Sequence, residues 1–181
     1  MLNYATISNH IGISQPTVKK WISLLETSGI IFLLQPHHKN FKKRLVKTPK
    51  LYFIDTGLML FLLSIRTIDE LMNHPLIGNI FETFIISEFH KRSYHMGERP
   101  ELYFWRDKSG NEIDLIADIG TNTLPVEIKF SKTYNKTMTT NIMSWLNLMN
   151  NSSEKGIVIY RGDSVFGKNS SVPVVPWWDI I

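Results

Sequence analysis

The pattern of apolar and polar positions along the chain predicts two modules, which meet near residue 65. Helical spacing predicts a short helix at 6–11 and a second helix at 15–27. Between these helices Gly12 makes a tight turn, and Ser14 is placed to cap the second helix. A helix, a turn that contains glycine and a second helix are the arrangement of a helix-turn-helix.

Two short apolar segments follow, at 30–34 and 50–54, and they are typical of the two strands of a hairpin. The polar segment between them, 37–47, contains five basic residues and no acidic one. In a winged helix this segment is the wing, so residues 1–65 are expected to form a winged-helix module. The module is expected to be truncated, because only residues 1–3 precede its first helix. A missing helix, or a whole missing domain, would make the chain a fragment of a longer protein.

The second module, residues 66–181, is predicted to be an α/β domain with a mixed central sheet. Its pattern changes between helical spacing and the two-residue alternation of strands. The expected elements are a helix at 76–91, strands at 102–106, 111–118 and 124–130, a helix at about 135–150 and a strand at 156–160.

Charged and apolar positions alternate in two of these strands, as on a sheet with two unlike faces. Asp114 shares its predicted face with Ile116, while Leu115 points to the other face. Glu127 and Lys129 share one face of the next strand, and their apolar neighbours share the other. Antiparallel pairing of the two strands brings Asp114 opposite Glu127, where like charges repel. A divalent cation would offset that repulsion.

Glu82 lies on the preceding helix among apolar residues, and a buried acid needs a partner. The candidate catalytic residues are Glu82, Asp114, Glu127 and Lys129. Two carboxylates and a main-chain carbonyl are hard oxygen ligands that suit Mg²⁺, or Mn²⁺ in its place. The proposed metal ligands are Asp114, Glu127 and Ile128, with Glu82 completing the cluster directly or through water. Lys129 would orient the nucleophile or neutralise the developing charge.

Composition narrows the classes of function. The chain has 181 residues, 43% of them hydrophobic and 20% charged, which is enough for one domain or two small ones. It has no cysteine, which excludes disulfides, cysteine-ligated zinc, iron–sulfur clusters and thiol nucleophiles. The longest apolar run, 58–63, is too short to span a membrane, and residues 1–20 lack the pattern of a signal peptide. We therefore expect a cytoplasmic protein without a membrane partner.

The charge is unevenly distributed between the two modules. Residues 1–65 have a balance of +6 and residues 66–181 a balance of −2. A basic module favours contact with phosphates, so DNA is the expected partner. The predicted DNA-binding residues are Lys19, Lys20, Lys39, Lys42, Lys43, Arg44 and Lys47. The alternative is a solvated basic loop on a module that contacts only protein.

Five stretches together resemble a known family. They are 46–58 (VKTPKLYFIDTGL), 78–82 (GNIFE), 103–107 (YFWRD), 112–114 (EID) and 126–129 (VEIK). They resemble the C-terminal region of a large family of prokaryotic AAA-type ATPases whose function is unassigned. The resemblance implies a winged helix and a PD-(D/E)XK domain, like that of restriction endonucleases, after an N-terminal ATPase domain. The chain has no phosphate-binding loop, so ATP is expected only in that missing domain.

Two functions from different classes remain open. The first is a Mg²⁺-dependent nuclease that acts on DNA phosphodiesters as the C-terminal part of an ATPase. The second is a non-catalytic DNA- or protein-binding module that retains the nuclease fold as a scaffold. In the second, Lys129 simply neutralises Glu127, and Asp114 is a solvated residue at the edge of the sheet.

Overall fold

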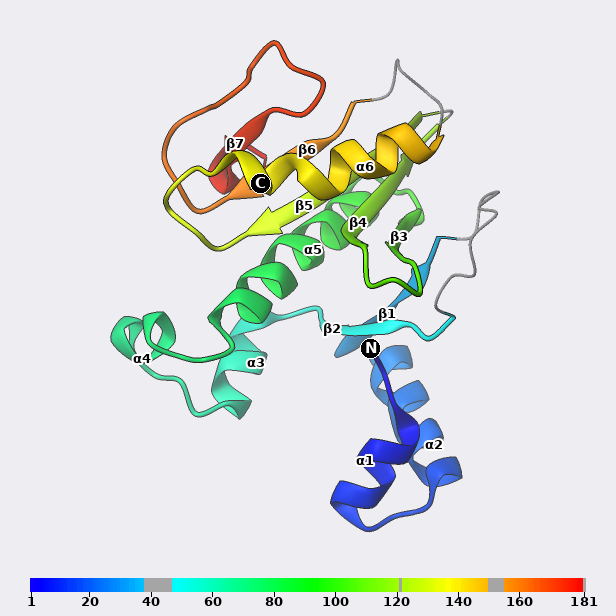
Figure 1. The fold of residues 1–181 in the computed structure, drawn as a ribbon. Coiled ribbons are helices and arrows are strands. Elements are labelled where there is room, and N and C mark those ends of the chain that lie inside the picture. Colours follow the sequence, from blue (N-terminus) through cyan, green and yellow to red (C-terminus); the bar gives the residue numbers. More distant parts are fainter. Residues whose placement is uncertain (38–46, 121, 150–154, 181) are drawn as a thin grey trace.

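The computed structural model describes residues 1–37, 47–120, 122–149 and 155–180 (Figure 1). The helices are α1 (Tyr4–Ile11), α2 (Gln15–Thr27), α3 (Thr56–Leu62), α4 (Ile68–Met72), α5 (Ile77–His95) and α6 (Thr140–Met149), with the short 3-10 helices η1 (Lys136–Thr139) and η2 (Trp177–Asp179). The strands are β1 (Ile31–Pro36), β2 (Lys50–Phe53), β3 (Leu102–Arg106), β4 (Glu112–Ile119), β5 (Asn122–Lys129), β6 (Ile157–Tyr160) and β7 (Val174–Pro176). Within these ranges, no helix is both long enough and apolar enough to cross a membrane.

The described strands form a seven-stranded mixed sheet in the order β2-β1-β3-β4-β5-β6-β7. This confirms the predicted α/β class, the mixed sheet and the place of β3 to β6 within it. The sheet also includes β1 and β2, which were expected to form a separate hairpin. β1 runs parallel to β3, and the backbone N–H of His37 donates to the carbonyl of Phe104 at 2.7 Å. This pairing satisfies backbone N–H and C=O groups of β3 that an edge strand would leave unpaired.

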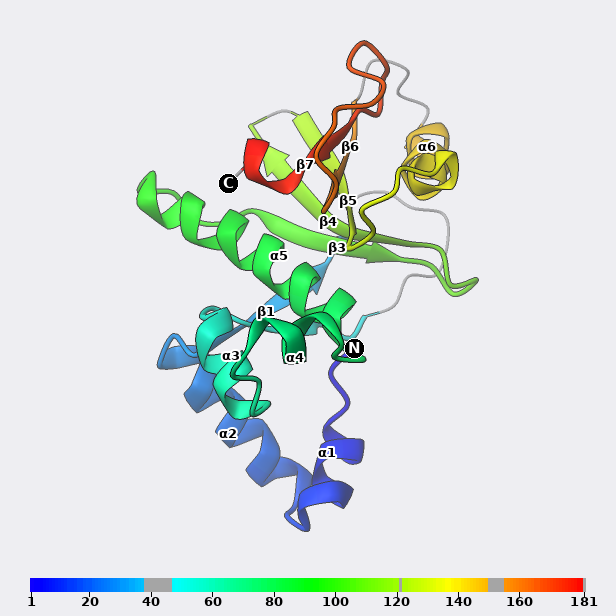
Figure 2. The same cartoon turned by 90° about the vertical axis from the view of Figure 1, so that its left-hand side faces the viewer.

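Helices cover both faces of the sheet (Figure 2). α5 packs on one face and contributes Phe81, Ile85 and Ile86 to the core there. α6 packs on the other face and contributes Ile142 and Trp145 to a second core. Because both faces are buried, the central strands are apolar on both sides, and a charged side chain among them needs a partner.

β1 takes part in two cores at once. Phe32 and Leu34 pack into the core against α5, whereas Ile31 and Leu33 pack with Val18 of α2. Successive side chains of a strand point to opposite faces, so a strand of this pattern can join two layers. The N-terminal helices are thereby attached to the same sheet that supports α5.

A β-bulge corrects the predicted faces of β4. Tyr103 pairs with Ile116 and Trp105 with Ile113, so two residue steps on β3 span three on β4. As a result Ile113 and Ile116 both pack in the core against α6, while Leu115 packs in the core against α5. The prediction that Ile113 and Leu115 share a face was wrong, because strict alternation does not allow for an inserted residue.

Candidate functional site

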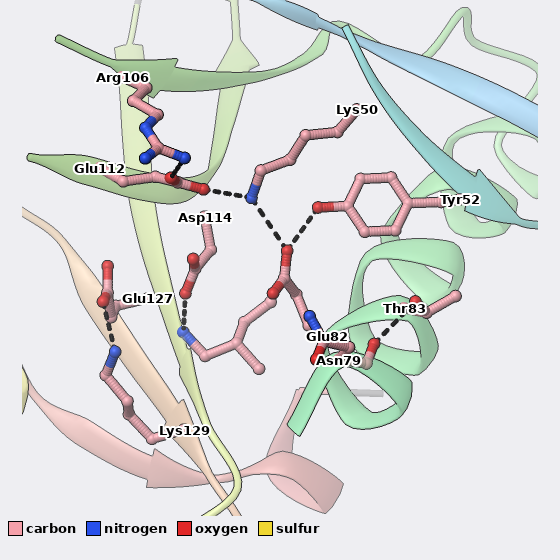
Figure 3. A network of polar contacts seen from close by, with 11 residues as sticks. Lys50, Tyr52, Asn79, Glu82, Thr83, Arg106, Glu112, Asp114, Glu127 and Lys129 are labelled. Carbon is pink, nitrogen blue, oxygen red and sulfur yellow. Dashed lines mark hydrogen bonds and ion pairs between the residues drawn. The ribbon is translucent and has the colours of Figure 1, made fainter. Parts of the chain in front are cut away.

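Asp114 lies at the bulge, where the ladder between β4 and β5 ends, close to β2 and α5 (Figure 3). The last pair of that ladder is Leu115 with Val126. One step further, Asp114 Oδ2 accepts a hydrogen bond of 2.9 Å from the backbone N–H of Ile128. The carboxylate thus bonds a backbone group of β5, and this contact holds it beside Glu127, as the sequence predicts.

Glu127 and Lys129 share a face of β5, as their alternation predicts, and α6 contacts Glu127 on that face. Glu127 Oε1 accepts hydrogen bonds from Lys129 Nζ at 2.5 Å and from Asn141 Nδ2 of α6 at 3.0 Å. The Glu127 side chain is only 3% exposed. Its second oxygen, Oε2, is buried and has no hydrogen-bond partner among the described residues. A buried carboxylate oxygen without a partner is energetically unfavourable, so this atom is available to a ligand.

Glu82 accepts its hydrogen bonds from side chains of β2. Glu82 Oε1 accepts hydrogen bonds from Lys50 Nζ at 3.0 Å and from the Tyr52 hydroxyl at 2.5 Å. Lys50 also forms an ion pair with Glu112 Oε1, and Glu112 Oε2 lies 3.1 Å from Arg106 Nη1. Figure 3 shows this chain of contacts on one side of Asp114 and the Glu127–Lys129 pair on the other. Glu82 is therefore bonded to β2, Asp114 to the backbone of β5, and Glu127 to Lys129 and α6.

The buried position of Asp114 and its acidic neighbours raise its pKa. Burial raises the pKa of Asp114 to about 8, and the charges of Glu127 and Glu82 act in the same direction. Lys50 and the N–H of Ile128 oppose this shift. Burial also raises the pKa of Glu127, although Lys129 and Asn141 favour its charged form.

The neighbouring acids favour the charged form of Lys50 and of Lys129. Burial disfavours the ammonium of Lys50, but Glu82 and Glu112 outweigh that effect and hold its pKa above the usual value. Burial likewise disfavours the ammonium of Lys129, and the neighbouring Glu127 raises its pKa in spite of it. Both lysines are therefore charged at neutral pH, and each compensates part of the acid cluster.

Five residues of this network were not predicted as site residues: Lys50, Tyr52, Arg106, Glu112 and Asn141. A signal for the first two was present. Lys50 and Tyr52 are two residues apart in a strand, so they share a face, and they lie within the stretch 46–58 that carries the family resemblance. No local pattern indicates that Asn141 of α6 meets Glu127, because that contact depends on how the helix crosses the sheet.

Asp114 and Glu127 are the residues whose oxygen atoms could hold a divalent cation. Throughout the described residues, no group of three or more His, Cys, Asp or Glu side chains is arranged to hold a metal ion. Glu82 Oε1 is engaged with Lys50 and Tyr52, and the prediction that Glu82 completes the metal site directly or through water stays a prediction. The candidate donors are the carboxylates of Asp114 and Glu127, the latter with its unpartnered Oε2, and the main-chain carbonyl of Ile128.

The predicted DNA-binding residues are described only in part. Lys19 and Lys20 are exposed on α2, and Lys47 is exposed shortly before β2. The ammonium of Lys19 lies 5.5 Å from the centre of the Tyr4 ring. Four others lie outside the described residues: Lys39, Lys42, Lys43 and Arg44.

Fold and site together define an α/β protein with helices on both faces of a mixed sheet and an acid–lysine cluster where one strand ladder ends. Residues 77–180 match the family described as a domain of unknown function, DUF4143, and the chain belongs to this family. Residues 1–69 match a second domain of unknown function, DUF8612. The two matched regions meet near the predicted module boundary.

Two curated relatives are similar to almost the whole chain. They are the uncharacterized proteins Mb2031c of Mycobacterium bovis and Rv2008c of Mycobacterium tuberculosis, each 26% identical over 174 residues. The similarity covers 95% of this chain but only 37% of each relative, so the chain spans little more than a third of their length. No solved structure matches.

Proposed function

We propose that this chain is a Mg²⁺-dependent nuclease that cleaves DNA phosphodiesters on a fold like that of restriction endonucleases. The observation that carries the proposal is Glu127 Oε2, a buried carboxylate oxygen without a hydrogen-bond partner among the described residues. It belongs to the strand that also bonds Asp114, whose pKa burial and neighbouring acids raise to about 8. Groups with strongly perturbed proton affinity gather at functional sites.

The residues have separate roles in this proposal. Asp114, Glu127 and the carbonyl of Ile128 would hold Mg²⁺ or Mn²⁺. When bound, the metal lowers the pKa of a water and stabilises negative charge on a phosphate. Asn141 fixes the rotamer of Glu127 through a 3.0 Å hydrogen bond. Lys129 lies 2.5 Å from Glu127 Oε1 and is 36% exposed, so it can also donate to a phosphate oxygen.

The N-terminal module would bring DNA to this site as a winged helix. α1, the turn at Gly12 and α2 support that assignment, since Gly12 adopts the left-handed conformation with φ of 70° and Ser14 caps α2. Lys19, Lys20 and Lys47 are exposed and would contact phosphates without reading bases. The curated relatives are longer than this chain, which supports a place in a longer protein. The resemblance to AAA-type ATPases implies that ATP would be bound only by an N-terminal ATPase domain of such a protein.

A plasmid cleavage assay tests the nuclease proposal. Supercoiled DNA is incubated with the protein and Mg²⁺ or Mn²⁺, and nicked and linear products are measured. We expect Asp114→Asn and Lys129→Gln each to reduce cleavage by roughly 100-fold or more. Glu88→Gln is the matched control, because Glu88 lies on α5 like Glu82 but pairs with Lys91 away from the site.

The second candidate is a non-catalytic DNA- or protein-binding module. It is favoured by the compensation of the acids within the chain: Lys50 pairs with Glu82 and Glu112, and Lys129 pairs with Glu127. Intact plasmid with both metals, together with no effect of either metal on the melting temperature, would make this the better assignment.

A further inference from the structure

β2 inserts a lysine between two acids that come from different elements. Lys50 Nζ lies 3.0 Å from Glu82 Oε1 of α5 and also pairs with Glu112 Oε1 of β4. The Lys50 side chain is 12% exposed. The remaining contacts of the two acids are made by Tyr52, which donates to Glu82, and by Arg106, which pairs with Glu112. Figure 3 shows the ammonium at the centre of this arrangement.

The position of this ammonium is that of a bridging cation. Two carboxylates held close together repel each other, and a positive charge between their oxygens removes that repulsion. In sites with two metal ions, each ion takes such a place among carboxylate oxygens. Here a covalently attached cation takes it, within the same cluster as Asp114, whose proton affinity responds to both Glu82 and Lys50.

We propose that the Lys50 ammonium permanently occupies the cation position between Glu82 and Glu112, so that this acid pair is closed to metals. The single divalent cation of the proposed function then binds only at Asp114 and Glu127. For this one ion, the inference rests on the proposed function. Since Lys50 belongs to β2, the N-terminal module is a part of the site and sets how many metal ions it accepts.

Counting bound Mn²⁺ on the full chain tests this inference. Electron paramagnetic resonance of free Mn²⁺ gives the number of ions bound per chain. We expect one ion for the native protein and two for Lys50→Met, which keeps an unbranched apolar stem and removes the charge. Lys50→Arg is the matched control, because it retains a cation and should still bind one. Adding Glu112→Gln to Lys50→Met should remove the gained ion.

The outcomes separate this inference from the proposed function. A native protein that binds no Mn²⁺, with Lys50→Met binding one, defeats the metal site at Asp114 and Glu127 and leaves the role of Lys50 supported. Two ions on the native protein, or equal numbers on the native protein and a folded Lys50→Met, overturn the inference. If Lys50→Met unfolds without metal, Mn²⁺ should restore its circular dichroism spectrum, and Glu112→Gln should abolish that restoration. Failure of Mn²⁺ to restore the fold also overturns it.

Discussion

Replacing Asp114 by asparagine should stabilise the metal-free protein, although it removes a residue of the candidate site. The carboxyl is surrounded by Glu82 and Glu127, and its environment disfavours the charged form. Asparagine is uncharged in both the folded and the unfolded state. Its carbonyl oxygen can still accept the hydrogen bond that the Ile128 N–H donates at 2.9 Å. The substitution therefore removes repulsion while it retains the local contact.

The magnitude follows from the pKa of Asp114, which is raised from 3.8 to about 8 in the folded state. Below pH 3.8 the carboxyl is protonated in both the folded and unfolded states, and the substitution has no electrostatic effect. Between these values only the unfolded state releases the proton, so native stability falls by up to ~1.4 kcal/mol per pH unit and levels off above pH 8. That is at most ~4 kcal/mol near pH 7. Because the charges of Glu127, Glu82 and Lys50 all act on Asp114, we expect a smaller measured gain of ~1–3 kcal/mol.

Thermal and urea unfolding between pH 4 and pH 9 measure this effect. For a chain of this size, each 1 kcal/mol shifts the melting temperature by roughly 2–4 °C. We expect the native protein and Asp114→Asn to melt alike near pH 4 and to diverge as the pH rises. Asp163→Asn is the control, because Asp163 is exposed and should give no such divergence. Saturation with Mg²⁺ at ~100 times its dissociation constant should add ~2.7 kcal/mol to the native protein alone.

Parallel pH profiles for the native protein and Asp114→Asn would refute this reasoning. They would show that Asp114 is charged in the folded state, and that Lys50 and Lys129 compensate it fully. A less stable Asp114→Asn at pH 8 would likewise mean that attraction to the lysines outweighs repulsion from the acids.

Three further predictions concern other parts of the chain. Changing Lys19 and Lys20 together to glutamate should weaken DNA binding and reduce the salt slope by ~2, as measured by fluorescence anisotropy, whereas Lys168→Glu should leave both unchanged. Ser14→Ala should lower the free energy of unfolding in urea by ~1 kcal/mol, because Ser14 Oγ accepts from a backbone N–H at the start of α2. Gly156→Ala should lower the free energy of unfolding by ~1–3 kcal/mol, measured as a lower melting temperature, because its Cβ would lie 2.3 Å from a buried methyl group of α6.

Local patterns were sufficient for much of the fold. The helices at α2 and α5 and the strands β3 to β6 follow from periodicity, because the spacing of apolar residues is fixed by the geometry of each element. The cap at Ser14 follows from the side chain and its own turn. Glu127 and Lys129 were correctly placed on one face of β5, since this strand has no bulge that shifts its alternation.

Contacts between distant segments were decided only by the tertiary structure. Lys50 and Glu82 are 32 residues apart, and nothing in the pattern around either one indicates the other. The bulge in β4 arises from its pairing with β3, so the sequence of β4 alone gave the wrong face for Ile113. The attachment of β1 to β3 likewise depends on two backbone edges that meet only when the chain is folded. Periodicity determines which side of an element is buried, whereas the partner across the interface depends on how separate elements pack, and in this protein that packing put Lys50 among the acids.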